Sequence, residues 1–118
     1  MQAIRLGIVS LVLILSAAAA HAHAYLDHAT PRVGSTVKSS PSEVRLFFTQ
    51  PLEPQFTSAQ VRSSSGAVVA TGSVDPAKPK EIVVRVNALP AGSYKVFWKV
   101  LSVDSHHTEG SFGFEVRP

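Results

Sequence analysis

The sequence predicts a small all-β protein, built as an antiparallel sandwich or barrel. Six or seven short runs alternate apolar and polar residues, as strands with one buried face do. Turn-forming Gly, Pro, Asp and Ser residues separate these runs. Beyond residue 22, no window places apolar residues at i, i+3, i+4 and i+7, the pattern of an amphipathic helix. With 118 residues, the chain is long enough for one domain and too short for two.

The first 22 residues have the pattern of a secretory signal peptide. A basic start ends at Arg5, an almost wholly apolar run extends from Leu6 to Leu15, and alanines fill positions 17–20. This order of charged, apolar and small segments is typical of a cleaved leader. The alternative, a membrane anchor, requires roughly 18 to 20 apolar residues, and this run is well short of that length. We therefore expect the segment to be removed.

Three cleavage positions satisfy the small-residue rule, and that rule alone leaves all three open. They are the bonds after Ala20, Ala22 and Ala24, which expose His21, His23 and Tyr25, respectively, as the first residue. The middle position divides the chain into a signal peptide, 1–22, and a mature domain, 23–118.

Composition excludes several classes of protein. The formal net charge of +3 falls by one when Arg5 is removed, and the remaining basic residues are scattered, so no basic stripe indicates a nucleic-acid partner. Cysteine is absent, which excludes disulfides and thiolate metal sites. Met1 is the only methionine and leaves with the signal peptide. The mature domain must therefore be stabilised by a packed core.

Most of the chain divides into expected strands and turns. Residues 24–43 are expected to be extended and irregular, because Pro31, Gly34 and Pro41 interrupt them. Pro51 and Pro54 bracket a loop. A turn is expected at 75–80, which contains two prolines. Between these breaks, alternation or β-branched residues predict strands at 43–49, 58–62, 68–74 and 81–86.

The clearest strand is 95–101, where Val96, Trp98 and Val100 alternate with the intervening residues. Trp98 in such a strand is expected to be a core residue. The approach to it, 89–94, has the form Leu-x-x-Gly-x-Tyr and resembles the tyrosine corner of immunoglobulin-like sandwiches, in which the phenol bonds to nearby backbone. A last strand is expected at 112–116, after a loop at 102–107.

That loop carries the candidate functional residues, Asp104 and His106. Residues two apart in extended backbone point to the same side, so the carboxylate and the imidazole can converge on one metal ion. A third contribution would come from His23 if cleavage makes it the first residue, because its free amine and imidazole can close a chelate ring. Such a nitrogen-rich N3O donor set suits Cu(II). Zinc favours a tetrahedral set, and calcium and magnesium require more oxygens.

The other histidines are weaker candidates for metal ligands. His21 is expected to leave with the signal peptide. His28 lies in the irregular segment and is expected to be a solvated surface residue. His107 follows His106 directly, so in extended backbone it faces the opposite way.

Three segments resemble the CopC family of periplasmic copper-binding proteins, and the resemblance spans essentially the whole mature chain. They are His23-Ala24-Tyr25-Leu26 leading to Thr30-Pro31, the segment from Arg45 to Leu52, and the block from Gly92 to His106. The resemblance implies a Greek-key, cupredoxin-like β-sandwich that binds one Cu(II) per chain through His23, Asp104 and His106. It also favours cleavage after Ala22, because family members begin with a His three residues before a Leu.

The chain departs from the family pattern at three places. Some relatives have a Met-rich Cu(I) site, for which this mature chain has no methionine. Some have a Glu near the copper where Gln50 stands here. His107 occupies a position that is often Pro.

The expected function is that of a periplasmic, monomeric copper carrier, without enzymatic activity, in copper resistance or homeostasis. Family resemblance implies an inner-membrane copper transporter of the CopD type as partner. One alternative is a copper mono-oxygenase with a histidine brace, although Asp104 would help to fill the equatorial positions that oxygen chemistry requires open. Another is a metal-free adhesion or scaffold module.

Overall fold

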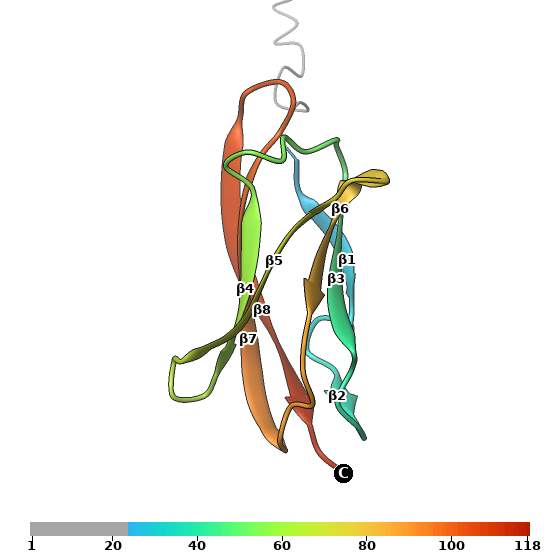
Figure 1. Cartoon of the computed structure of the whole chain (residues 1–118), viewed down its shortest axis with the longest axis vertical. Helices are drawn as coiled ribbons and strands as arrows, with labels where there is room; N and C mark the ends of the chain where they lie inside the picture. Colours follow the sequence, from blue (N-terminus) through green and yellow to red (C-terminus); the bar gives the residue numbers. More distant parts are fainter. Residues whose placement is uncertain (1–23) are drawn as a thin grey trace, which may run out of the picture.

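The computed structural model describes residues 24–118, which form two facing layers of β-strands (Figure 1). The predicted all-β sandwich is confirmed. The strands are β1 (Leu26–Thr30), β2 (Thr36–Val37), β3 (Glu43–Phe48), β4 (Ser58–Ser63), β5 (Val68–Asp75), β6 (Lys78–Arg85), β7 (Gly92–Leu101) and β8 (His107–Val116).

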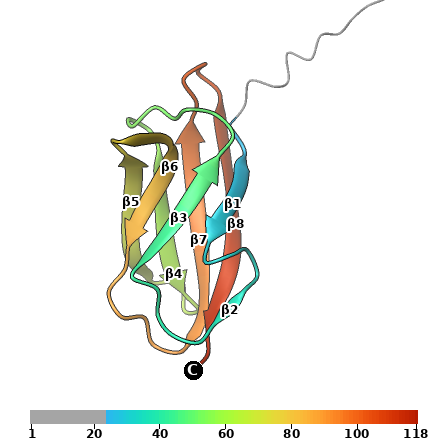
Figure 2. The same cartoon turned by 90° about the vertical axis from the view of Figure 1, so that its right-hand side faces the viewer.

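Strand β5 belongs to both layers. Its residues from Val68 to Gly72 pair with β4, in the layer that also holds β7, β8 and β2. Its residues from Ser73 to Asp75 pair with β6, in the layer that continues to β3 and β1. All pairings are antiparallel except that of β2 with β8. Figure 2 shows the second layer from its outer side, with β3 crossing in front of β7.

Gly72 stands where β5 passes from one layer to the other. A Cβ added at this position would collide with the carbonyl oxygen of Val83 and would lie 2.7 Å from the Cα of Val84. Both atoms belong to the backbone of β6, which cannot move aside as a side chain could. The close approach of the two strands therefore requires glycine here.

The core fills the space between the layers with aliphatic and aromatic side chains. Trp98 is 8% exposed, as expected for a core residue, and meets Phe48 edge to face with ring centroids 5.2 Å apart. Opposite Trp98 in the ladder is Gly110. A Cβ at Gly110 would lie 2.5 Å from Cζ2 of the indole, so the ring occupies the space that a side chain would need. The largest fully buried apolar residues are Leu46, Ile82, Val44, Val61, Val84, Val96 and Val100.

The predicted tyrosine corner is present. The hydroxyl of Tyr94 donates a hydrogen bond of 2.6 Å to the carbonyl oxygen of Pro90, four residues earlier. The bond satisfies the polar end of a ring that is only 7% exposed. It fixes the entry of the chain into β7, the strand that ends at the metal-site candidate.

The structure corrects three strand predictions. Residues 24–43, expected to be irregular, contain β1 and β2. In β1 only Ala29 is fully buried, so the strand lacks the apolar alternation by which it would be recognised. Strand β6 begins at Lys78, inside the expected turn.

The third correction concerns β8, which begins at His107, whereas the sequence predicts a strand from residue 112. Its first half places Thr108 and Gly110 on the inner side, where a strand usually has large apolar residues. Trp98 supplies the missing volume from β7, and the sequence of β8 alone carries no sign of this.

Arg45 joins three acidic side chains on the outer face of the β3 layer. Its guanidinium donates to Glu43 (3.2 Å), Asp75 (2.9 Å) and Glu81 (3.1 Å), and all four side chains are at most about one-third exposed. The hydrogen bond from Arg45, helped by one from the backbone N–H of Ala77, holds the pKa of Asp75 below its ordinary value of 3.8.

We expect this network to make stability fall in acid. Because the pKa of Asp75 is lower in the folded state, the unfolded state binds more protons, and unfolding becomes easier as pH drops. The contribution is complete above about pH 5 and is lost as pH falls through the folded-state pKa below 3.8. Urea unfolding of the metal-free protein between pH 2 and 7 measures it. In Arg45→Met the acid-dependent loss should be smaller, and an identical pH profile would contradict the assignment.

Candidate metal centre

The loop between β7 and β8 carries both described candidate ligands. It runs from Ser102 to His106 and lies at the same end of the molecule as the start of β1 and the loop before β4 (Figures 1 and 2). Ser105 has a φ of 73°, in the left-handed region. The loop is therefore a tight turn, and the expectation that extended backbone brings Asp104 and His106 together is wrong in its mechanism. The turn brings them together instead.

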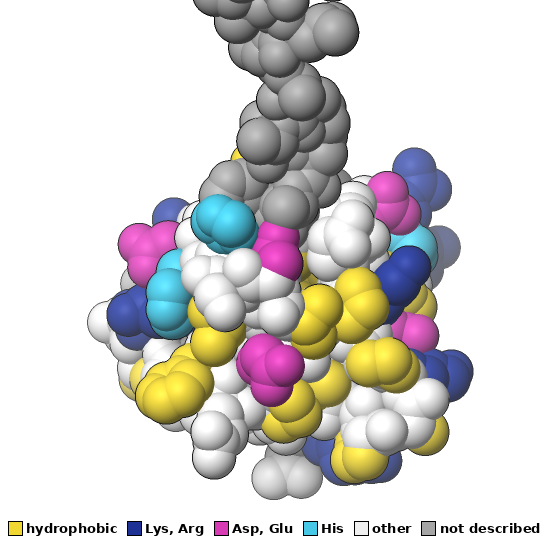
Figure 3. Space-filling model, turned by 90° about the horizontal axis from the view of Figure 1, so that it is seen from above, with side chains coloured by type: hydrophobic (Ala, Val, Ile, Leu, Met, Phe, Trp, Pro, Cys, Tyr) yellow, Lys and Arg dark blue, Asp and Glu magenta, His cyan; other side chains and the backbone are white. Residues whose placement is uncertain are grey.

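The two side chains meet directly. Asp104 Oδ2 lies 3.2 Å from His106 Nδ1, and the side chains are 32% and 47% exposed, respectively. A hydrogen bond from the Ser102 hydroxyl, and to a lesser extent contact with His106, hold the pKa of Asp104 below its usual range. The carboxylate is thus anionic at neutral pH and open to solvent on one side. Seen from this end, imidazole and carboxylate side chains lie close together on the surface (Figure 3).

The first described residues are bound firmly next to this loop. Ala24 is fully buried, and its carbonyl oxygen accepts a 2.6 Å hydrogen bond from the hydroxyl of Thr108, two residues after His106. Tyr25 pairs with Thr49: its N–H donates to the hydroxyl (3.0 Å) and its carbonyl oxygen accepts from the N–H (2.9 Å). Ala24 therefore lies at the β8 end of the Ser102–His106 loop (the metal loop).

Other sequence candidates are placed less centrally. His23, the third expected ligand, and the expected signal peptide lie outside the described residues. His28 is exposed, bonds to Asp27 through Nδ1 (2.7 Å) and stacks on Phe47 with centroids 4.1 Å apart. His107 is exposed at the start of β8. Among residues 24–118 no group of three or more His, Cys, Asp or Glu side chains forms a site for a metal.

Gln50 lies in a short segment that touches both parts of the candidate centre. On one side of it, Thr49 is bound to Tyr25. On the other, the carbonyl oxygen of Pro51 accepts a 3.2 Å hydrogen bond from the N–H of Val103. The segment thus ties Tyr25 to the metal loop.

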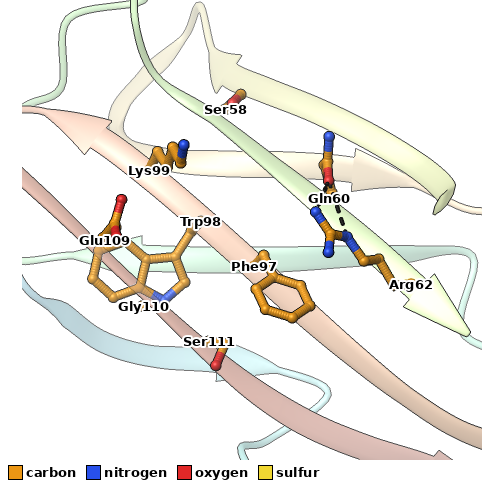
Figure 4. A pocket seen from close by; sticks show the side chains of 9 residues that line it. All are labelled: Ser58, Gln60, Arg62, Phe97, Trp98, Lys99, Glu109, Gly110 and Ser111. Carbon is orange, nitrogen blue, oxygen red and sulfur yellow. Dashed lines mark hydrogen bonds between the residues drawn. The ribbon is translucent and has the colours of Figure 1, made fainter. Parts of the chain in front are cut away.

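A separate groove of about 480 Å³ lies on the outer face of β4, β7 and β8 (Figure 4). Arg62 there binds the side-chain oxygen of Gln60 twice, at 3.0 and 3.2 Å, and its guanidinium lies 4.3 Å from the ring centre of Phe97. Neither Asp104 nor His106 lines this groove.

From Ala24 onward, no helix has the length and apolarity needed to cross a membrane.

The comparisons with known proteins identify the family of the chain. A model of the CopC domain family matches residues 26–117. This chain belongs to the CopC family. The match includes the metal loop, the strands on both sides of it and nearly all of the described fold. The resemblance found in the sequence is therefore confirmed.

Solved CopC-family structures share the fold closely. The crystal structure of CopC from Methylosinus trichosporium OB3b is 35% identical, has a TM-score of 0.77, and covers 81% of this chain and 95% of that one. PcoC from Escherichia coli is 31% identical with a TM-score of 0.72, over 81% of this chain and all of PcoC. Copper resistance protein C of Pseudomonas syringae pv. tomato is 32% identical over 112 residues, 88% of each chain.

One difference within the CopC family concerns methionine. The Escherichia coli protein PcoC is described as a methionine-rich copper resistance protein. Met1 is the only methionine of the present chain. Residues 2–118 therefore contain no thioether that could serve as a metal ligand. The candidate donors of this chain are nitrogen and oxygen atoms.

Sequence reasoning missed the residues that hold the loop. Ser102 is completely buried and bonds to Asp104, yet a serine at the end of a strand carries no distinguishing pattern. Thr108 bonds to Ala24 across 84 positions, a contact that only the fold creates. The candidate ligands can be recognised by residue type, whereas the residues that support them cannot.

Proposed function

We propose that this protein is a periplasmic copper-binding protein that holds one Cu(II) through His23, Asp104 and His106. The signal peptide, residues 1–22, would be removed on export, so that His23 begins the mature chain. The observation that carries the proposal is the 3.2 Å approach of Asp104 Oδ2 to His106 Nδ1 on a loop beside the buried Ala24.

The spacing of these two donors fits a metal ion. First-row divalent metals hold nitrogen and oxygen donors at roughly 2.0 to 2.2 Å. Two donors in neighbouring coordination positions are therefore about 3 Å apart. The separation of Asp104 Oδ2 and His106 Nδ1 is 3.2 Å, close to this value. Both side chains are partly exposed, so an ion can reach them from solvent.

The anchoring of Ala24 supports His23 as the third ligand residue. His23 directly precedes Ala24 in the sequence, and consecutive Cα atoms are about 3.8 Å apart across a trans peptide bond. Ala24 is tied to Thr108, which follows the metal loop by two residues. A free amine and an imidazole on His23 would add two nitrogen donors to the pair on the loop. Three nitrogens and one carboxylate oxygen favour Cu(II) by donor type and by the Irving–Williams order.

The family supports a role in copper resistance or homeostasis. A relative at 32% identity is named copper resistance protein C. We infer that the mature protein is monomeric in the periplasm and passes copper to a membrane copper transporter of the CopD type. Cu(II) is the cargo of such a protein, and no enzymatic step is required.

Copper titration of the protein that starts at His23 tests the proposal. We expect one tightly bound Cu(II) with a tetragonal N/O electron paramagnetic resonance (EPR) spectrum, and binding that weakens in acid because amine and imidazole must be deprotonated. His106→Gln should weaken binding by more than about 100-fold, beyond the usual effect of losing an outer-shell contact.

The matched control is His107→Gln, which changes the adjacent and exposed imidazole and should leave affinity unchanged. Equal losses in the two variants would contradict the assignment of His106. Ascorbate-driven peroxide formation above that of free copper would instead favour the mono-oxygenase alternative.

A further inference from the structure

Ser102 is the buried polar residue at which the metal loop begins. It is 0% exposed, whereas the residues from Val103 to His106 are exposed. Its hydroxyl hydrogen-bonds to Asp104 Oδ1, and the same oxygen lies 3.3 Å from the N–H and 3.2 Å from the carbonyl oxygen of His106. A buried hydroxyl without partners would be costly, so these contacts determine where the side chain points.

The chemistry of the groups fixes the direction of each bond. A serine hydroxyl has one proton and can also accept. The N–H of His106 can only donate, so the Ser102 oxygen accepts from it. The single hydroxyl proton then goes to the Asp104 carboxylate rather than to the His106 carbonyl oxygen, because ionised acceptors form the stronger bond. A chain of two hydrogen bonds thus runs from the His106 backbone to the Asp104 side chain.

We propose that Ser102 is the positioning residue of the metal loop, and that its hydroxyl makes Asp104 bind metal through Oδ2 alone. Oδ1 is occupied by Ser102, whereas Oδ2 faces His106 Nδ1 at 3.2 Å. Ser102 therefore determines which carboxylate oxygen of Asp104 can bind the metal and on which side of the loop that oxygen lies. This inference rests on the proposed copper site.

The backbone frame of the loop does not depend on the hydroxyl. The N–H of Ser102 donates to the carbonyl oxygen of His106 (3.0 Å), and the N–H of Ser105 donates to the carbonyl oxygen of Ser102 (2.9 Å). Ser102 also bridges to Leu52 through backbone. Ser102→Ala keeps all of these groups, so we expect it to fold and to lose only the hold on Asp104.

Copper affinities of the parent and five variants test the proposal. Ser102→Ala should bind Cu(II) about 10- to 100-fold more weakly than the parent, with an altered EPR spectrum, whereas Ser102→Thr should restore most of the affinity. Val103→Ala, in the same loop but 52% exposed, is the matched control and should change affinity little, because the printed hydrogen bond of Val103 is made by its backbone. In an Asp104→Ala background, Ser102→Ala should cost nothing further, because Ser102 acts through Asp104. Additive losses would overturn the positioning role.

A copper-free measurement separates this inference from the proposed function. Ser102→Ala removes an acceptor of the His106 N–H, so hydrogen exchange at that amide should become faster than in the parent and in Val103→Ala. Unchanged exchange would contradict the role of Ser102 whatever the affinities are. If Asp104→Ala and His106→Gln bind copper as the parent does, the proposed site fails, while faster exchange would still support Ser102 as the organiser of the loop.

Discussion

Acetylation of the His23 α-amine is expected to weaken Cu(II) binding by more than about 100-fold, because it removes a ligand rather than an outer-shell contact. An acetylated amine becomes an amide, carries no free lone pair and can no longer close a chelate ring with the imidazole. All side chains and all hydrogen bonds described for Ala24 and Tyr25 remain available. A competition titration with a chelator of known affinity measures the change.

The modification can be made selectively. An α-amine has a pKa of about 7.7 to 8.0 and a lysine about 10.4, so near pH 6.5 the α-amine is the more reactive group. The control is a tag appended to Pro118, which lies at the opposite end of the molecule from the metal loop (Figure 2). That tag should leave affinity unchanged. Equal affinity of acetylated and free protein would eliminate the amine as a ligand.

The same experiment depends on where the signal peptide is cut. We expect the mass of the exported protein to correspond to residues 23–118. A chain that starts at Tyr25 would lack His23 altogether. A chain that starts at His21 would place His23 third, where it can form an amino-terminal copper site without Asp104. Either mass would require a different ligand set.

The parts of the fold that the sequence predicts are those with local patterns. The alternation around Trp98 predicts β7, and the Leu-x-x-Gly-x-Tyr approach predicts the bond from Tyr94 to Pro90. Strand β1 and the first half of β8 have no such pattern, because their inner positions are held by Ala29, Thr108 and Gly110. The positions of these two strands depend on their pairing with β3 and β7, and the local sequence pattern does not contain this information.

The candidate site divides in a similar way. Asp104 and His106 are candidates because a metal requires particular donor atoms at short spacing, and the structure places Asp104 Oδ2 3.2 Å from His106 Nδ1. The route differs from the expected one, since the left-handed Ser105 turns the chain between them. Ser102 and Thr108 support the site through contacts made only after folding. Residue chemistry can therefore indicate ligands, while their preorganisation is a property of the fold.

The largest loss of stability from a single methyl group is expected at Gly72. In Gly72→Ala the new Cβ would collide with the Val83 carbonyl oxygen and approach the Val84 Cα to 2.7 Å, so β5 and β6 would have to separate. Overpacking of this kind costs about 1 to 3 kcal/mol or more. In a domain of this size, about 3 kcal/mol would lower the melting temperature by more than about 10 °C.

Gly113→Ala is the matched control for this substitution, because it also adds a methyl group to a strand glycine. There the new Cβ would lie 3.4 Å from the Tyr94 carbonyl oxygen, an ordinary contact, and β7 need not move. Thermal unfolding of the metal-free proteins should therefore show a large decrease for Gly72→Ala and little change for Gly113→Ala. Equal effects would mean that β5 can move away from β6 at low cost. The two layers would then not depend on a close crossing at Gly72.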